Sequence, residues 1–245
     1  MTLRLHHVPG SRSVRVLWML EELGLDHEVV RHSIRDGSLR APEVLAVSPA
    51  GRAPALEWGD GTATFESGAI VQMLAERHPE AGLDRPAGDP ARGRYLQGIH
   101  FAETMASLIE NLNLSHVFLR PPARPSVPVL KVTTARLKAT LGGLEAMLAG
   151  RDHLAGGFSA ADAMMGFNLW AAPRFVALDP FPGVAAYRDR LAARPAFRRA
   201  QAADGASDIY DRDFYPIPVE EASDAGGQPP DPRDTSGKRK GGGGA

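Results

Sequence analysis

The first 79 residues alternate between short apolar runs and segments with a helical spacing of apolar positions. In the clearest segment Val16, Leu20 and Leu23 recur at i, i+4 and i+7, and Gly24 follows in the position of a C-terminal cap. Two apolar runs, "APALEW" and "ATF", flank "GDG", which is typical of a hairpin. The pattern predicts, in order, a strand at 3–7, a helix at 14–24, a strand at 28–31, a short helix at 42–47, the hairpin, and a helix at 67–78 that ends before Pro79.

Strand patterns largely vanish beyond "HPEAGLDRPAGDP", which has the Pro and Gly content of a linker. The following sequence is rich in Ala and Leu and predicts helices at 91–118, 132–148, 160–176, 184–193 and 195–203. Ser159 and Asp162 form an S-x-x-D capping box in front of one of them. We therefore expect an α/β domain at 1–79, a linker at 80–90 and an all-α domain at 91–217. The tail at 218–245 is too poor in apolar residues to form a core and is expected to be disordered.

Hydrophobic residues make up 43% of the 245 residues, enough for a substantial core, and the net charge is −1. This charge gives no reason to expect nucleic acid or an anionic membrane as the main partner. No apolar run reaches the roughly 18–20 residues of a membrane span, and the N-terminus lacks a signal peptide's apolar core, so we expect a cytoplasmic protein. The absence of cysteine excludes disulfides, Cys-bound zinc and cysteine nucleophiles, and no cluster of His and carboxylates indicates a metal site.

Two serines stand where the first predicted strand runs into the first helix, in "PGSRSVRVLWMLEELGL". Ser11 or Ser13 could cap the helix, because serine is among the best N-cap residues. A helix N-terminus also concentrates free N–H groups and positive potential, which favour a bound anion. These residues alone favour capping. Ser13 directly precedes the first periodic apolar residue, Val14, where an N-cap belongs, whereas Ser11 lies in the loop.

Two further stretches allow a structural and a functional interpretation. In "SPAGRAPALEW", Pro54 could be an edge-strand or turn proline. Alternatively, a cis Ala53–Pro54 bond would expose the N–H and C=O groups of Ala53 to an extended peptide. In "FESGAI", Glu66 and Ser67 stand between a strand and a helix, where Ser67 could cap or the free N–H groups could bind a carboxylate. Taken singly, each stretch favours the structural interpretation.

Taken together, the stretches resemble a known family. Their order and spacing are similar to those of the N-terminal domain of cytosolic glutathione S-transferases, on the segments "SRSVRVLWMLEELGL", "SPAGRAPAL" and "FESGAIVQMLAERHP". The opening looks most like a serine-type branch of bacteria and fungi. The helical half, with "GGFSAADAMMGFNLW", resembles their C-terminal domain, and the resemblance covers residues 1–203. It implies a thioredoxin-like α/β domain followed by an all-α domain, glutathione as co-substrate, no metal, and a homodimer.

The resemblance also implies roles for residues near the reacting sulfur. Ser11 matches the hydroxyl that hydrogen-bonds the glutathione sulfur, and Ser13 is the close alternative. Arg12 is a candidate to assist near the sulfur, although an arginine at such a junction is more often solvated. Ala53, before the matched cis proline Pro54, would pair through its backbone with the cysteinyl part of glutathione.

The same resemblance assigns the two ends of glutathione. Glu66 and Ser67 match the pair that holds its γ-glutamyl amino and carboxylate groups. Arg40 and Arg52 fall where relatives carry polar or basic residues near its glycine carboxylate. His6 and His7, on or beside the first strand, are expected to be structural. Three apolar residues of the helical half could equally line the pocket for a second substrate or belong to the core: Met105, Ile109 and Leu112.

The implied activity is conjugation of the glutathione thiolate to an apolar electrophile. The serine hydroxyl donates a hydrogen bond throughout, and glutathione itself is the nucleophile. A chain without cysteine cannot carry out disulfide exchange through a mixed disulfide. A peroxidase or isomerase reaction in the same site, or a non-enzymatic binding protein with the same fold, remains an alternative.

Overall fold

The computed structural model describes residues 2–207 and 209–218, so the predicted tail from residue 219 onward lies outside the described residues. The α/β half contains β1 (Leu3–His7), α1 (Val14–Leu23), β2 (His27–Arg31), α2 (Pro42–Val47), β3 (Ala55–Glu57), β4 (Ala63–Phe65) and α3 (Ser67–Arg77). The helical half contains α4 (Arg92–Asn113), α5 (Val127–Met147), α6 (Ala160–Ala171), α7 (Pro182–Ala192) and α8 (Pro195–Asp204). The order confirms the predicted fold class.

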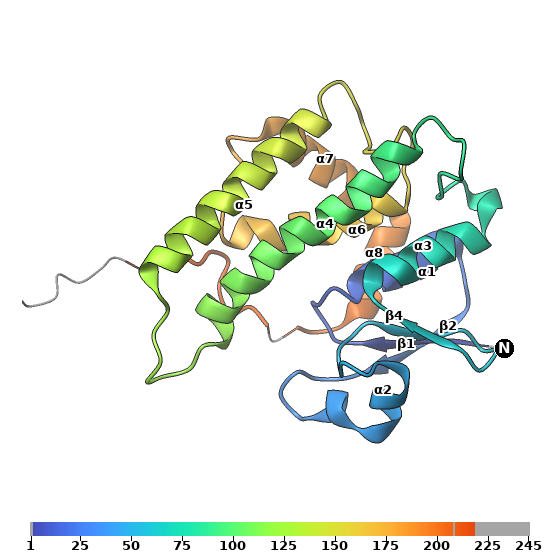
Figure 1. Ribbon diagram of the computed structural model, residues 1–245, viewed down its shortest axis with the longest axis horizontal. Helices are drawn as coiled ribbons and strands as arrows, with labels where there is room; N and C mark the ends of the chain where they lie inside the picture. The colour runs from blue at the N-terminus through green and yellow to red at the C-terminus, as the bar shows by residue number, and fades with distance from the viewer. Residues whose placement is uncertain (1, 208, 219–245) are drawn as a thin grey trace, which may run out of the picture.

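The sheet has the strand order β2-β1-β3-β4. Strand β1 pairs in parallel with β2 and antiparallel with β3, and the predicted hairpin joins β3 to β4. Helices α1 and α3 cover one face of the sheet and α2 lies against the other (Figure 1). Leu5 of β1 and Leu56 of β3 are fully buried in the core between the sheet and its helices. This is a thioredoxin-like layer, and it directs the ends of β1 and β4 toward the helical half.

Helix α1 joins the two halves because almost all of its side chains are buried. It packs on α3 within the α/β half and on α6 and α8 of the helical half. The closest approach is at Gly166 of α6, where a Cβ atom would lie 2.5 Å from the Trp18 ring. Only glycine therefore allows α6 to lie this close to α1.

Some helix ends differ from the sequence expectation. Helix α5 begins at Val127, earlier than the predicted residue 132, because Pro128 is compatible with a first helical turn. Helix α4 ends at Asn113 and continues as a π-helical turn over Leu114–Phe118. Helix α6 ends at Ala171 because Pro173 lacks the N–H group that would continue it, and a 3₁₀ turn follows.

The segment after α8 packs onto the body of the protein. Ile209 and Tyr215 are buried, and the backbone N–H of Tyr215 donates to Arg174 O at 2.8 Å. The domain was predicted to extend to residue 217, but the family resemblance ended at residue 203 and did not indicate where this segment packs. None of the helices in the described part of the chain is long and apolar enough to cross a membrane.

Asp162 confirms the predicted capping box and extends it into a buried network. Its Oδ2 accepts from the N–H and hydroxyl of Ser159 at 2.8 and 3.0 Å. Its Oδ1 accepts from the N–H of Leu154 at 3.0 Å and from the hydroxyl of Tyr187 at 2.6 Å. Burial, with the nearby Asp162 charge, raises the pKa of Tyr187 well above its usual value, so this hydroxyl stays a donor.

We expect Asp162→Asn to lower the free energy of unfolding by about 2 kcal/mol, because an amide offers one acceptor oxygen where four buried donors converge. Urea unfolding followed by circular dichroism measures this change. Asp189→Asn, at an exposed position of α7, is the matched control and should leave the midpoint unchanged. Equal effects of both substitutions would contradict the role of the network.

Candidate active site

The loop between β1 and α1 presents the Ser11 hydroxyl to a cavity between the two halves of the chain. Ser11 Oγ accepts a hydrogen bond from the backbone N–H of Ser13 at 3.2 Å and lies 2.8 Å from Ser13 Oγ. Ser11 O accepts from Val14 N at 3.1 Å, which begins the first turn of α1. Ser11 thus stabilises the turn that leads into α1, and it also lines the cavity.

Ser13 has a different role from the predicted one. It is fully buried, has helical dihedral angles and makes no side-chain cap bond. Its Oγ instead accepts from Val8 N at 3.1 Å and lies 2.8 Å from His7 Nδ1 and 3.1 Å from Val8 O. Ser13 stands at the predicted N-cap position, but its side chain does not cap the helix, because a turn over residues 11–14 points the Ser13 hydroxyl back toward His7 at the end of β1.

The Ala53–Pro54 peptide bond is cis, as the functional interpretation predicted. Ala53 lines the cavity that contains Ser11, and no described residue pairs with its backbone N–H or C=O group. These two groups can therefore bond to an extended peptide beside Ser11.

The junction of β4 and α3 forms the second polar part of the site. Glu66 has a φ of 74°, which is uncommon for a residue with a side chain. Ser67 is the first residue of α3, but its hydroxyl makes no cap bond, so the expectation of simple capping is wrong here too. Ser67 Oγ instead accepts from Arg15 Nη1 at 3.0 Å. The free N–H groups of α3 remain oriented toward a small cavity lined by Glu66 and Ser67.

Arg15 is a buried residue beside the site that the sequence interpretation missed. This side chain is fully buried and bonds to one group from each of three helices: Ser67 of α3, Glu103 of α4, and Asn168 Oδ1 of α6 at 2.8 Å. Burial lowers the pKa of Arg15 to about 10, with Glu103 acting in the opposite direction, so the guanidinium remains charged at neutral pH. A charged residue on the same helical face as Trp18 was the available signal, since such a charge is buried only with partners.

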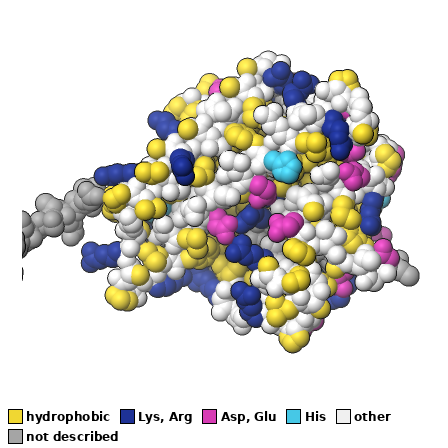
Figure 2. All heavy atoms as spheres, in the orientation of Figure 1, with side chains coloured by type: hydrophobic (Ala, Val, Ile, Leu, Met, Phe, Trp, Pro, Cys, Tyr) yellow, Lys and Arg dark blue, Asp and Glu magenta, His cyan; other side chains and the backbone are white. Residues whose placement is uncertain are grey.

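Arg12 lies between the two cavities and is paired with carboxylates of α4. Its Nη1 donates to Glu103 at 3.3 Å and its Nη2 donates to Glu110. Arg52 lies 3.7 Å from Glu110 and is largely exposed at the same rim. Figure 2 shows acidic and basic side chains gathered in the middle of this face, where the surface is hollowed. Arg40 does not line these cavities, and its Nη1 donates to Ala50 O at 3.3 Å.

Two adjoining cavities make up the candidate site. A small one of about 90 Å³ is polar and lies at the start of α3; its predicted lining residues are Arg52, Ala53, Pro54, Glu66 and Ser67, together with Arg12. A larger one of about 310 Å³ shares Arg12, Arg52 and Ala53 with it and contains Ser11. The remaining wall of the larger cavity is mostly apolar and also contains three polar side chains, those of Glu110, Asn113 and Asn168. Its apolar and aromatic residues are Val8, Ile34, Leu39, Ala106, Ile109, Phe118, Phe167, Ile209 and Tyr210, and Gly10 completes it.

Among the apolar candidates, only Ile109 lines the larger cavity, whereas Met105 and Leu112 are core residues. Ile209 and Tyr210, from the segment after α8, were missed because that segment has no secondary structure that a pattern could indicate. No group of three or more His, Cys, Asp or Glu residues within 2–207 and 209–218 could hold a metal ion.

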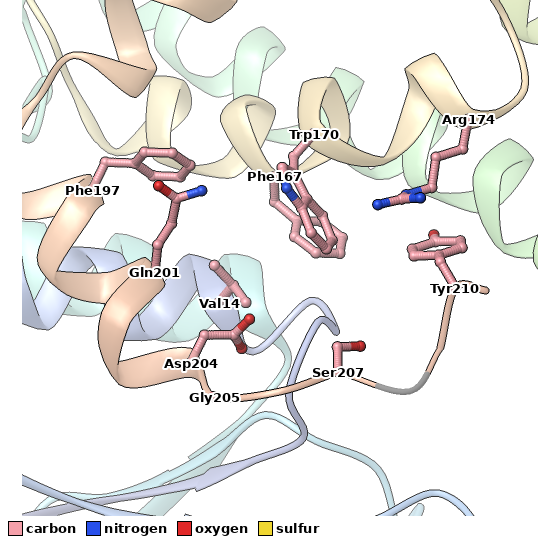
Figure 3. Close-up of a pocket in the computed structure, with 10 residues that line it drawn as sticks. All are labelled: Val14, Phe167, Trp170, Arg174, Phe197, Gln201, Asp204, Gly205, Ser207 and Tyr210. Atoms are coloured by element: carbon pink, nitrogen blue, oxygen red, sulfur yellow. The ribbon is translucent and has the colours of Figure 1, made fainter. Parts of the chain in front are cut away.

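Another cavity, of about 300 Å³, adjoins the site on the far side of Phe167 and Tyr210, which line both. Figure 3 shows Phe167 projecting from α6 into this space, and Asp204 at the end of α8 on its edge. Arg174 lies over the Tyr210 ring at 4.4 Å from its centroid. The segment after α8 therefore separates two cavities rather than covering only one.

Sequence comparisons identify the family. Residues 5–82 match the family model "Glutathione S-transferase, N-terminal domain". The chain is 30% identical over 211 residues to glutathione S-transferase 3 of Schizosaccharomyces pombe, covering 80% of this chain and 85% of the relative. It is 33% identical over 201 residues to maleylacetoacetate isomerase of Pseudomonas aeruginosa, covering 80% and 93%.

Solved structures agree with this result. The glutathione transferase of Methylococcus capsulatus has a TM-score of 0.72 at 28% identity, covering 83% of this chain and 99% of that one. A sphingomonad glutathione S-transferase complexed with glutathione has a TM-score of 0.70 at 28% identity, covering 83% and 100%. With a relative at 30% identity matched over most of both chains, a matching family model and the same fold, this chain belongs to the glutathione S-transferase family.

Proposed function

We propose that this protein binds glutathione across the two adjoining cavities and adds its thiolate to an apolar electrophile. The observation that carries the proposal is the common position of Ser11, Ala53 and Ser67 along one continuous surface, next to an apolar cavity. A relative of the same fold is complexed with glutathione. The size and mostly apolar wall of the larger cavity fit a small electrophile.

In this proposal the γ-glutamyl end of glutathione occupies the small polar cavity. Its carboxylate accepts from the N–H groups at the start of α3 and from the Ser67 hydroxyl, and its amino group pairs with Glu66. The cysteinyl part pairs with the backbone of Ala53. Arg52, exposed at the rim, is within reach of the glycine carboxylate, whereas Arg40 bonds to Ala50 O and would have to turn to reach it.

Ser11 is proposed to stabilise the thiolate. A free thiol with a pKa of about 8.5 is only about 3% ionised at pH 7. A donor hydroxyl and the positive end of α1 favour the anion, and lowering the thiol pKa by about two units corresponds to about 2.7 kcal/mol. Arg12 is the nearest cation, and its pairs with Glu103 and Glu110 limit its attraction for the sulfur.

Isomerisation is the second candidate function, because maleylacetoacetate isomerase is 33% identical to this chain. In such a reaction the thiolate adds to a conjugated double bond and leaves again after rotation, so glutathione is not consumed. The same site residues would serve both reactions. A homodimer and a cytoplasmic location are proposed from family membership.

Binding and turnover assays test the proposal and separate it from a non-enzymatic binding protein. We expect calorimetry to detect glutathione binding and a chromogenic aryl halide to be conjugated. A maleyl-type substrate tests isomerisation, with glutathione measured before and after. Ser107→Ala, at an exposed site on α4, is the control variant and should behave as the wild type. Binding without turnover of either substrate class would support the binding protein, and no binding would refute the proposal.

A further inference from the structure

His7 is a buried titratable residue that the proposed chemistry does not use. It is the last residue of β1 and is fully buried. Its Nδ1 lies 2.8 Å from Ser13 Oγ, and its Nε2 lies 3.0 Å from the Asp204 carboxylate and 3.2 Å from Asp204 O. Because Ser13 Oγ is 2.8 Å from Ser11 Oγ, an unbroken series of hydrogen bonds joins Ser11 to the end of α8.

The hydrogen bonds of this series can run in two directions, depending on whether the His7 ring is neutral or protonated. Both partners of His7 Nε2 on Asp204 are acceptors, so a proton is held on Nε2. In the neutral ring Nδ1 is then an acceptor, Ser13 donates to it, and Ser11 can donate to Ser13. In the protonated ring Nδ1 donates to Ser13, Ser13 donates to Ser11, and the Ser11 hydrogen is free for the sulfur.

We propose that Ser13, His7 and Asp204 form a proton relay that takes up the proton of the glutathione thiol when it ionises. This inference rests on the proposed function. The S–H bond breaks and leaves its electron pair on sulfur; the proton passes to Ser11 Oγ, the Ser11 proton to Ser13 Oγ, and the Ser13 proton to His7 Nδ1. The products are a thiolate and an imidazolium, with no oxidation and no covalent bond to the protein.

The proton transfer reverses the direction in which the Ser13 and Ser11 hydroxyls donate, and stabilisation of a thiolate requires this direction. After the transfer the Ser13 hydroxyl donates to Ser11, whose own hydrogen then points to the thiolate. Ser13 and His7 are therefore positioning residues, because they act on the sulfur only through Ser11. Asp204 has a comparable place to the carboxylate of a Ser-His-Asp triad, which fixes the tautomer of its histidine.

Charged and titratable groups lie on the elements packed against His7. Asp204 contributes its carboxylate and the carbonyl end of α8. Arg31 of β2 donates to Ala203 O at 2.6 Å, and the backbone N–H of His32 donates to His7 O at 2.8 Å. The Asp204 carboxylate therefore favours a positive charge on His7, whereas Arg31 and His32 oppose it.

The relay also has an outlet. Asp204 lines the cavity shown in Figure 3, whereas Ser11 lines the larger cavity of the active site. The Asp204 side chain is partly exposed. Once Nδ1 has taken up a proton, the imidazolium can release its other proton, the one on Nε2, by way of Asp204 to water in the second cavity, which leaves a neutral ring protonated on Nδ1. This proton does not cross the site where the electrophile binds.

A purely structural interpretation predicts a different result. If these bonds only connect α8 to the loop after β1, then breaking them lowers the melting temperature and leaves the ionisation of bound glutathione unchanged. His7→Gln separates the interpretations, because a glutamine amide can still donate to Asp204 but offers no group at the Nδ1 position. Ser13→Ala breaks the same series at a second point.

The experiment measures the ultraviolet absorbance of the thiolate of bound glutathione against pH, together with kcat and KM, in the wild type and both variants. His6→Gln is the matched control, because His6 is a buried neighbour on β1 that bonds to Glu57 and His32 and has no link to Ser11. In His7→Gln and Ser13→Ala we expect the thiol to titrate nearer to free glutathione and kcat at neutral pH to fall about 10- to 100-fold. KM for glutathione should be unchanged, and His6→Gln should titrate as the wild type.

If the thiol of glutathione bound to either folded variant titrates as it does in the wild type, the relay is refuted. If the wild type itself forms no thiolate with glutathione, the proposed function fails and the relay with it, so the two failures are distinguishable. Should neither variant fold, the wild type provides the test through the rate of thiolate formation in mixtures of H2O and D2O. A curved dependence on deuterium content, as several protons move, supports the relay, and a linear dependence refutes it.

Discussion

Ser11→Ala is expected to lower turnover roughly 10- to 1000-fold, which is the scale of removing one donor to an anion in an active site. Ser11 Oγ lines the larger cavity, whereas Ser13 is buried behind it. The variant should also shift the pH–rate profile toward the pKa of the free thiol, because less thiolate exists near neutrality. Steady-state kinetics across a pH series measures both effects.

This substitution should also cost stability. Ser11 Oγ accepts from Ser13 N in the turn before α1, so its removal takes away one hydrogen bond, which is worth about 1 kcal/mol. Ser11→Thr keeps the hydroxyl and is expected to restore most of the turnover. A turnover of Ser11→Ala equal to that of the wild type would mean that another group stabilises the sulfur.

Arg15→Met is expected to lower the free energy of unfolding by about 3 kcal/mol, because it leaves buried polar groups on several helices without their partner. Glu103 is partly exposed and can regain water, so most of the loss comes from Ser67 and Asn168. For a chain of this size, this loss lowers the melting temperature by about 6–12 °C. Differential scanning calorimetry measures the shift.

The same substitution should weaken glutathione binding, because Arg15 orients the Ser67 hydroxyl beside the small polar cavity. Arg199→Met is the matched control: Arg199 pairs with Glu21 across α1 and α8 but is exposed. An exposed pair contributes about 0–1 kcal/mol, so this control should be nearly neutral. A melting temperature of Arg15→Met close to that of the control would contradict the role given to Arg15.

Features that depend on residues near one another in the chain could be predicted from the sequence. The 3.6-residue spacing of Val16, Leu20 and Leu23 determined α1, and "GDG" between apolar runs determined the β3–β4 hairpin. The capping box of Ser159 and Asp162 was predicted for the same reason. These signals are local because helix periodicity, turns and caps involve groups only a few residues apart.

Tertiary structure decided the role of each polar group in the site. The Ser13 hydroxyl stands at the N-cap position but does not cap α1, because it bonds instead to His7 at the end of β1 and to Val8. Arg15 is buried because partners from three other helices reach it, and no spacing in the sequence reports their approach. Local propensity cannot encode such pairings, because a buried charge is stable only when distant segments satisfy it.

The contacts between residues farthest apart in the sequence involve the end of the described chain. His7 and Asp204 are far apart in the sequence, yet they bond directly, and Ile209 and Tyr210 complete the cavity that contains Ser11. The apolar and aromatic residues of 209–217 separated this segment from the polar tail, but they did not indicate which surface the segment covers. Burial of Ile209 and Tyr215 against the helical half made this segment part of the fold, because apolar surface is removed from water only where another element covers it.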